Sequence, residues 1–239
     1  MRSFWEIMKM VSKPRNLVLV VGVLALWPGS SSAAIIEIGL TAEITYIEDD
    51  DGLLKGQLSV GDLITGSYTY DSDTPDSHPG EGVGEYWHDS PPFGIRLGAG
   101  GFAFQTDPDD VDFLIGTVNN NIQQDIYGIR SSRNLPLYDG VSVTHIQWQL
   151  DDYSGTALSS DVLPLEPPVL EDWPDTWYGL GISGSTGDPR GPQYFIRSTV
   201  TSVWLVPEPG TALLFGLGGL ALLRRRRWAL RNPVAGKSM

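Results

Sequence analysis

Strict alternation marks one segment near the N-terminus, which reads Ile36-Glu37-Ile38-Gly39-Leu40-Thr41-Ala42-Glu43-Ile44-Thr45-Tyr46. Apolar or aromatic side chains occupy one parity, and polar or small ones occupy the other. Period-two alternation over this length predicts a β-strand that buries one face. The acidic run from Glu48 to Gly52 then predicts a turn.

Short apolar segments continue along the chain, separated by Gly, Asn, Asp or Pro. We expect strands at Leu63–Tyr70, Phe93–Leu97, Gly101–Thr106, Phe113–Val118, Asp125–Arg130, Val141–Leu150, Trp177–Ser183 and Tyr194–Leu205. Ser77–Pro92 is expected to form a long surface loop, and Thr156–Leu163 one or two helical turns. Because no long stretch has helical periodicity, the sequence predicts a mainly β fold, an antiparallel β-sandwich or jelly roll.

The N-terminus has the three parts of a secretory signal peptide. Basic residues up to Arg15 precede the apolar run Leu17–Trp27, and the small residues Ser32-Ala33-Ala34 follow. The run is shorter than the roughly 20 residues of a transmembrane helix. We therefore interpret residues 1–34 as a signal peptide for the Sec export machinery, cleaved after Ala34, with an uncleaved anchor as the alternative.

Three features follow one another at the C-terminus. The first is a neck, Val206-Pro207-Glu208-Pro209, whose prolines exclude a helix interior or a central strand. The second is the uncharged run 211–223, which can satisfy its own backbone as a helix in lipid, although about 20 Å is short for a core of about 30 Å. The third is a cluster of four arginines, Arg224, Arg225, Arg226 and Arg227. This cluster and the short tail 228–239 should stay on the cytoplasmic side.

The order of these features resembles the PEP-CTERM sorting signal of exopolysaccharide-producing Gram-negative bacteria. The likeness runs through Val206-Pro207-Glu208-Pro209, Thr211, Leu213-Leu214, Gly216-Leu217, Leu220 and the arginines, so that residues 206–227 form the signal. It implies recognition by an exosortase, a membrane cysteine protease that cleaves near the motif. It also implies an inner-membrane-anchored precursor with a periplasmic ectodomain, and a mature form at the cell surface or outside the cell.

A weaker likeness concerns the ectodomain itself. The segment Gly66-Ser67-Tyr68-Thr69-Tyr70-Asp71 and the later Ala157-Leu158-Ser159-Ser160 resemble the mostly uncharacterised ectodomains of PEP-CTERM proteins. Those ectodomains are presumed β-sandwiches, which agrees with the fold class expected from alternation.

The segment between the two signals, residues 35–205, is strongly acidic. It holds 27 acidic and 6 basic residues, a formal net charge of −21. Such a surface repels nucleic acid and anionic lipid, so it excludes a DNA- or RNA-binding role and favours cations. The chain has no cysteine, which excludes disulfides, thiolate metal sites and a cysteine nucleophile. The 171 residues suit one domain with a full core.

Two acidic loops are candidate calcium sites. Asp71, Asp73 and Asp76 follow one expected strand, and Asp107 and Asp109 follow another. Calcium takes six to eight oxygen ligands, which such loops can supply from carboxylates and carbonyls. Neither loop has EF-hand spacing, and a solvated acidic turn is the alternative. Calcium is thus a candidate cofactor that the fold does not require.

Signals for catalysis are weak. No Gly-x-Ser-x-Gly elbow occurs, and the glycines of Gly179-x-Gly181-x-x-Gly184 lack the following helix that a dinucleotide site needs. His78 and His88 lie among glycines and prolines that forbid the helical geometry of a zinc site. A glycosidase carboxylate pair is defined in space and cannot be recognised here.

The tryptophans fall into two groups. Trp148 and Trp204 are in phase with apolar neighbours, so we expect them in the core. Trp87 and Trp173 lie in expected loops, where an exposed ring could stack on a sugar, although covering a core edge is the alternative.

Taken together, these patterns predict an exported, exosortase-processed surface or extracellular-matrix protein that is non-catalytic and associated with exopolysaccharide. The membrane, through residues 211–223, the exosortase and a polysaccharide are the expected partners, and nucleic acid is not. A calcium-dependent carbohydrate-binding or adhesion module is the first alternative, and a secreted hydrolase is the second.

Overall fold

The computed structural model describes residues 34–207, apart from residues 79, 81, 122, 176–178 and 189–190. The expected signal peptide before Ala34 and everything after Pro207 lie outside these residues. The described residues form ten strands and one short 3-10 helix, which confirms the mainly β prediction. A search of the same residues finds no helix with the length and apolarity to cross a membrane.

The strand bounds agree with most of the expected segments. The elements are β1 (Ile35–Glu48), β2 (Leu63–Asp71), β3 (Val83–His88), β4 (Gly94–Ala99), β5 (Phe102–Gln105), β6 (Phe113–Asn121), β7 (Gln124–Ser131), β8 (Ser142–Asp152), η2 (Leu170–Asp172), β9 (Gly179–Ser185) and β10 (Gln193–Leu205).

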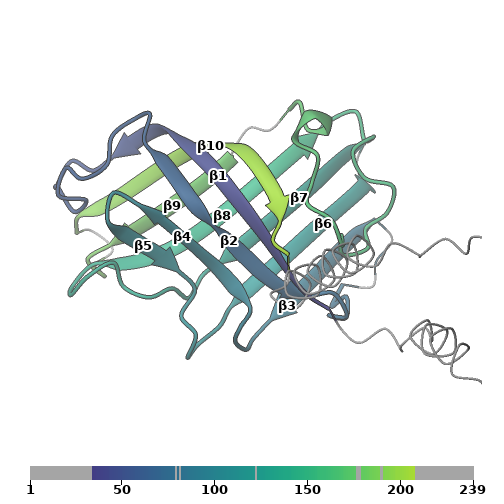
Figure 1. Cartoon of the computed structure of the whole chain (residues 1–239), viewed down its shortest axis with the longest axis horizontal. Helices are drawn as coiled ribbons and strands as arrows, with labels where there is room; N and C mark the ends of the chain where they lie inside the picture. The colour runs from purple at the N-terminus through teal and green to yellow at the C-terminus, as the bar shows by residue number, and fades with distance from the viewer. Residues whose placement is uncertain are drawn as a thin grey trace, which may run out of the picture. The chain divides into compact units, whose positions relative to one another are not determined.

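All ten strands belong to one antiparallel sheet. Their order is β3-β6-β7-β8-β9-β10-β1-β2-β4-β5, so the first and last strands lie side by side within it. The sheet curls until β1, β2 and β4 cross in front of β6, β7 and β8 (Figure 1). The two layers expected of a sandwich are therefore two halves of one continuous sheet.

The core lies between the inner faces of these two halves. Tyr68 of β2 contacts Tyr127 of β7 through a hydrogen bond of 2.8 Å between their hydroxyls. The Trp148 ring of β8 packs edge-on against both tyrosines, with centroid distances of 6.3 and 5.9 Å. All three side chains are buried, which confirms the expectation that Trp148 is a core residue.

One strand departs from expectation, because β3 lies within the predicted surface loop Ser77–Pro92. It pairs with β6 and buries Tyr86 and His88 on its inner side. Its free edge is capped, since the Ser77 amide donates to the Glu85 carbonyl at 2.9 Å. The Glu85 amide in turn donates to an Asp76 carboxylate oxygen at 2.9 Å. The glycines and prolines that suggested a loop flank this strand, except Gly84, which lies within it where other atoms approach the backbone closely.

Two irregularities in the pairing of β1 with β10 move aromatic rings to the outer face. On β1 the register shifts between Ile44 and Tyr46. On β10 it shifts between Val200 and Ser202. A bulge inserts one residue, so the side chains beyond it change faces. The expectation that Tyr46 and Trp204 belong to the core is therefore wrong, and they are 45% and 44% exposed.

The predicted helical turns at Thr156–Leu163 are also absent, and this described segment is an irregular loop. Two buried carboxylates hold it. Asp152 accepts hydrogen bonds from the amides of Thr156 and Ala157 at 2.7 and 3.0 Å, and Asp125 accepts one from Leu158 at 2.7 Å. Such bonds compete with helical pairing.

Trp173, just after η2, lies at the far end of the long connection from β8 to β9. Its side chain is buried, so it covers an edge of the core and is not available for stacking on a ligand.

Candidate functional site

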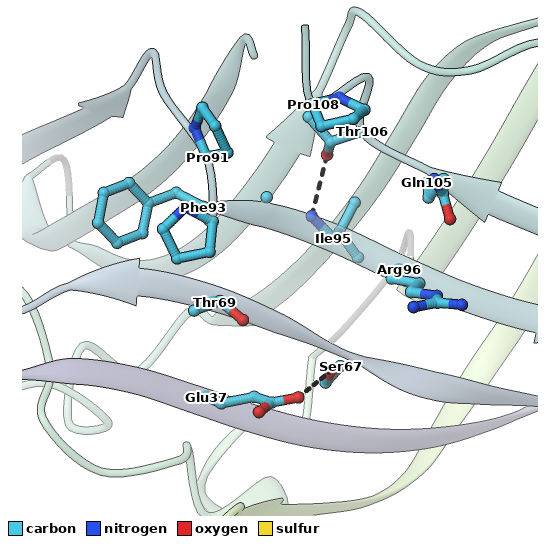
Figure 2. A pocket seen from close by; sticks show the side chains of 12 residues that line it. Glu37, Ser67, Thr69, Pro91, Phe93, Ile95, Arg96, Gln105, Thr106 and Pro108 are labelled. Carbon is cyan, nitrogen blue, oxygen red and sulfur yellow. Dashed lines mark hydrogen bonds between the residues drawn. The ribbon is translucent and has the colours of Figure 1, made fainter. Parts of the chain in front are cut away.

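The first cleft lies on the outer face of β1, β2 and β4 and has a volume of about 300 Å³. Its floor carries Glu37, which accepts a hydrogen bond of 2.6 Å from the Ser67 hydroxyl. Exposed Arg96 lies at one end, and a rim that includes Pro91, Phe93 and Pro108 lies along one side (Figure 2). The cleft combines a carboxylate, a guanidinium and hydroxyls with an apolar wall.

The second cleft, called here the glycine trough, lies on the opposite outer face and has a volume of about 280 Å³. It crosses β3, β6, β7 and β8, with Gly116 and Gly128 paired directly to each other. Its other outward-facing lining residues are of three kinds. Val83, Leu114, Val118 and Ile126 are apolar, Gln147 and Gln149 carry amides, and Glu85 and Arg130 are charged. A surface of this kind offers both apolar contact and hydrogen bonding.

The third cleft, of about 410 Å³, lies beside the trough on β8, β9 and β10. It contains His145, Ser183 and Glu48, residue types that a hydrolase uses. The Ser183 hydroxyl contacts Thr144 Oγ1 at 3.2 Å, whereas no hydrogen bond of the described residues joins it to His145. In the cross-strand register Phe195 separates Ser183 from Glu48. The cleft therefore lacks the linked nucleophile, base and carboxylate of a triad.

One cross-strand row runs through the glycine trough and continues across the sheet to β1. Strand pairing aligns its members across seven strands from β3 to β1, and we call this row the outer strip: Trp87, Leu114, Arg130, Gln147, Gly181, Arg197 and Tyr46. No sequence pattern predicts this row, because it depends on which strands are neighbours.

An arginine lies against an aromatic ring at each end of the outer strip. The Arg130 guanidinium carbon lies 5.5 Å from the centre of the Trp87 ring. The Arg197 guanidinium carbon lies 5.9 Å from the Tyr46 ring and 5.8 Å from the Phe195 ring. Cation–π contacts of this kind hold a guanidinium in place while its N–H donors stay available.

The first predicted calcium loop places its carboxylates on local backbone amides. An Asp71 oxygen accepts from the Asp73 amide at 2.9 Å, and an Asp76 oxygen accepts from the His78 amide at 2.8 Å. Across the described part of the chain, no group of three or more His, Asp or Glu side chains is placed to hold a metal ion. Calcium binding by this loop stays a prediction that the geometry does not support.

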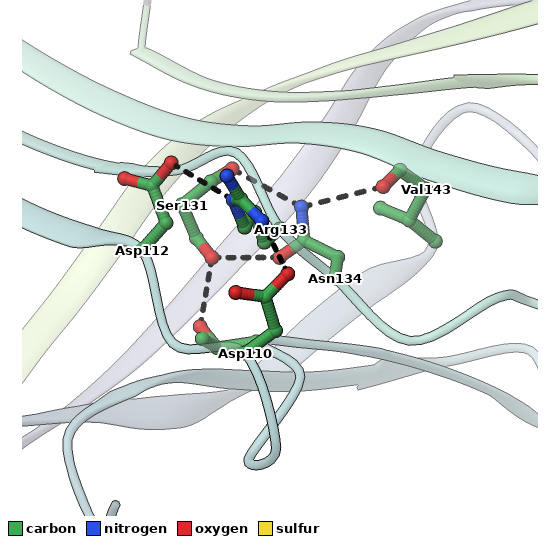
Figure 3. A network of polar contacts seen from close by, with 7 residues as sticks. Asp110, Asp112, Ser131, Arg133, Asn134 and Val143 are labelled. Carbon is green, nitrogen blue, oxygen red and sulfur yellow. Dashed lines mark hydrogen bonds and ion pairs between the residues drawn. The ribbon is translucent and has the colours of Figure 1, made fainter. Parts of the chain in front are cut away.

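In the second predicted calcium loop the carboxylates also have partners within the protein. An Asp107 oxygen accepts from the Asp109 amide at 2.9 Å. The carboxylates of Asp110 and Asp112 both pair with Arg133, which lies above a small polar network (Figure 3). These ion pairs are at the surface and should add little stability.

The polar network beneath Arg133 joins the two halves of the sheet. Thr106 Oγ1 contacts Ser131 Oγ at 2.8 Å, and the Ser131 hydroxyl donates to Asn134 Oδ1 at 2.7 Å. Asn134 Nδ2 donates to the carbonyls of Ser131 and Val143 at 3.1 and 3.3 Å (Figure 3). Because every member has a partner, the network closes the sandwich near β5 and has a structural role.

His88, the histidine buried on β3, also has a structural role. Its Nε2 accepts a hydrogen bond from the Asp71 amide at 3.1 Å and contacts the Thr74 hydroxyl at 2.9 Å. Burial lowers the pKa of the imidazole below its ordinary value, so the ring is neutral at pH 7. The His88 ring packs against Phe93 in a T-shaped arrangement with a centroid distance of 5.1 Å.

The described chain ends where the expected sorting signal begins. The Val206 amide donates to the Glu37 carbonyl at 2.8 Å, which continues the pairing of β10 with β1. Pro207 follows and has no amide hydrogen to extend the ladder. The neck therefore starts directly at the sheet, beside the first residues of β1. Glu208, Pro209 and the arginines Arg224–Arg227 lie outside the described residues.

Comparison with protein families gives one result for this end of the chain. The family model described as the PEP-CTERM protein-sorting motif matches residues 205–227. This confirms the resemblance seen at the C-terminus and supports an exosortase as a partner, because the motif is the signal that exosortases recognise. Searches among curated proteins and among solved structures find no match.

Proposed function

We propose that this protein is a surface or extracellular-matrix protein that binds exopolysaccharide without catalysis. Its PEP-CTERM protein-sorting motif already implies an exported protein that is targeted by an exosortase. The observation that carries the binding role is the outer strip, where exposed aromatic rings, arginines and an amide form one row along the outer surface of the curled sheet. A polymer can follow such a row with both of its ends free.

The linings of the clefts favour binding over hydrolysis. Glycoside hydrolysis commonly needs two carboxyl groups that flank the scissile bond. Among the described lining residues, Glu37 is the only carboxylate of the first cleft, and Glu85 is the only one of the glycine trough. In the third cleft the Ser183 hydroxyl contacts Thr144, and no hydrogen bond of the described residues joins it to His145 as in an activated nucleophile.

The proposed life history has two steps. The signal peptide 1–34 directs export through the Sec machinery, and residues 211–223 hold the precursor in the inner membrane with the arginines on the cytoplasmic side. Exosortase then cleaves near Val206-Pro207-Glu208-Pro209 and delivers the domain outward. Because the neck begins directly after β10, cleavage there leaves every described strand with the mature protein.

The processing step is tested with the full chain in an exosortase-carrying Gram-negative host. We expect the wild-type chain in the extracellular fraction with a mass shortened at both ends. A variant with Pro207→Ala, Glu208→Ala and Pro209→Ala should remain in the membrane fraction with its C-terminus intact. A host without the exosortase should retain the wild-type chain in the same form. Release of the triple variant at the wild-type mass would refute this role of the motif.

The binding step is tested by isolating the host's exopolysaccharide and washing it in buffers of rising ionic strength. We expect the processed protein to remain with the polymer and to rebind it after purification. Recovery of all processed protein in the first wash, together with no rebinding, would refute polysaccharide binding while leaving the sorting role intact.

A further inference from the structure

We propose that the outer strip and the adjoining glycine trough form one binding site for a polysaccharide chain that carries carboxylate groups. This inference rests on the proposed function, because it names the site and the ligand class for the same domain. It requires that the strip have a suitable length, suitable chemistry and free space above its floor.

The length of the strip suits a polymer. Neighbouring strands lie about 4.8 Å apart, so the strip is about 29 Å long from Trp87 to Tyr46 when measured along the curled sheet from β3 to β1. Several sugar rings fit along this distance. The two end rings are 42% and 45% exposed, and each can stack on the apolar face of a sugar.

Side chains that donate hydrogen bonds lie between the two end rings. Arg130 and Arg197 each offer five N–H groups in a planar fork, which matches a carboxylate in a bidentate arrangement. Gln147 lies beside Arg130 in the row, and no hydrogen bond of the described residues occupies its exposed amide. An amide can both donate to and accept from sugar hydroxyls.

The charge distribution favours an anionic ligand at these positions. The domain has 6 basic residues against 27 acidic ones, yet Arg130 and Arg197 both lie in the outer strip. Neither forms an ion pair with a described residue, whereas Arg133 forms two. Acidic residues elsewhere on the surface, and Glu85 within the trough, repel a polyanion, which confines the carboxylate contacts to the arginines of the strip. Carboxylate-bearing sugars would supply the partners that these two arginines lack.

The glycines leave the required space. A Cβ added at Gly116 or Gly128 would come no closer than 4.0 and 3.6 Å to another atom. Neither glycine has the left-handed backbone that favours glycine. By contrast, a Cβ at Gly66 would lie 2.0 Å from the Arg96 carbonyl oxygen.

Glycine inside a strand weakens the strand, and it often marks a place where a ligand or another backbone approaches closely. At Gly66 the neighbouring strand makes that approach. At Gly116 and Gly128 the neighbouring protein atoms do not, and both glycines line an open cleft, whereas Gly98 lines none of the three clefts, so we assign the approach to the ligand.

Substitution of these glycines should therefore separate stability from binding. Gly128→Val restores a residue that strands favour, so the fold should be kept or slightly stabilised while the floor of the trough is blocked. Gly98→Val on β4 is the matched control, because it also has room for a Cβ, with its nearest atom at 3.8 Å, and it lies far from β7 in the strand order. Arg130→Gln tests the carboxylate contact, and its control is Lys55→Gln, which removes one positive charge from an exposed residue outside the strip and the three clefts.

The experiment uses the full chain purified in detergent and measures its binding to polygalacturonate, to dextran and to the host's exopolysaccharide. Thermal unfolding of each variant shows whether it is folded. We expect wild type to bind polygalacturonate at least tenfold more tightly than dextran. Gly128→Val and Arg130→Gln should each weaken binding about tenfold or more, and the two controls less than about twofold.

The outcomes separate the inference from the function on which it rests. Binding that is unaffected by Gly128→Val and Arg130→Gln would refute the site but leave polysaccharide binding standing. Equal affinity for dextran and polygalacturonate, with no effect of Arg130→Gln, would refute the ligand class. Failure of the wild-type chain to bind any of the three polymers would refute the proposed function itself.

Discussion

The buried contact between Tyr68 and Tyr127 allows the packing of the two sheet halves to be measured. Their hydroxyls lie 2.8 Å apart, and neither has another hydrogen-bond partner among the described residues. Burial raises the pKa of both phenols well above the ordinary value, so both are protonated at pH 7. Tyr68→Phe or Tyr127→Phe alone would leave the other hydroxyl buried without a partner.

The expected magnitudes follow from this geometry. An unsatisfied buried polar group costs about 1–3 kcal/mol, so each single variant should lose that much stability. The double variant removes both hydroxyls, so it should lose less than the sum of the single variants by about 1–3 kcal/mol. For a domain of this size, about 1 kcal/mol corresponds to roughly 2–4 °C in Tm.

The assay is thermal unfolding of the exported protein, followed by near-ultraviolet circular dichroism. Tyr153→Phe is the control, because Tyr153 is 58% exposed and the change should stay within about 0.5 kcal/mol. Additive losses in the double variant would show that the two tyrosines do not touch. That result would refute the packing of β2 on β7 and, with it, the curled sheet.

Three further predictions concern stability. Hydrogen bonds, chiefly the one from the Ser154 hydroxyl, hold the pKa of Asp152 well below its usual range. The stability that the ionised carboxylate adds is complete above about pH 4 and is lost as the pH falls through the folded pKa, so the stability that Asp152→Asn loses at pH 7 should shrink at acid pH. A loss of stability that does not change with pH would contradict this. Burial lowers the pKa of His88, so protonation favours the unfolded chain and stability should fall as the pH drops below about 6.5; His88→Gln should flatten that part of a Tm-versus-pH curve, and an unchanged slope would argue against it. Gly66→Ala should cost about 1–3 kcal/mol or more in chemical denaturation, because the new Cβ meets backbone at 2.0 Å, whereas Gly98→Ala should be close to neutral, and equal effects would be inconsistent with the register of β2 and β4.

Alternation in the sequence is sufficient to predict most strands, because side-chain burial on one face leaves a period of two. It fails where the backbone departs from that period. The bulges near Thr45 and Thr201 leave no mark in the apolar pattern, so alternation assigns Tyr46 and Trp204 to the wrong face. In β3 the inward-facing positions include Gly84, which has no apolar side chain to signal burial.

The outer strip could not be predicted from the sequence, because its members become neighbours only through strand order. Trp87 and Arg130 belong to β3 and β7, which are separated in the sheet by β6. Arg197 approaches Tyr46 only because the last strand pairs with the first. The sorting motif, in contrast, is contiguous in the chain, so its residues can be recognised from their order alone.

Covalent footprinting of the exposed aromatic rings is the most direct test of the claim that the domain binds polysaccharide along the outer strip. Trp87 and Tyr46 mark the two ends of the strip, and Trp204 and Tyr153, of similar or greater exposure, lie outside it. The exported protein is labelled with hydroxyl radicals with and without the host's exopolysaccharide. We expect protection of Trp87 and Tyr46, with Trp204 and Tyr153 unchanged. Undiminished labelling of Trp87 and Tyr46 in the polymer-bound protein would contradict binding along the strip.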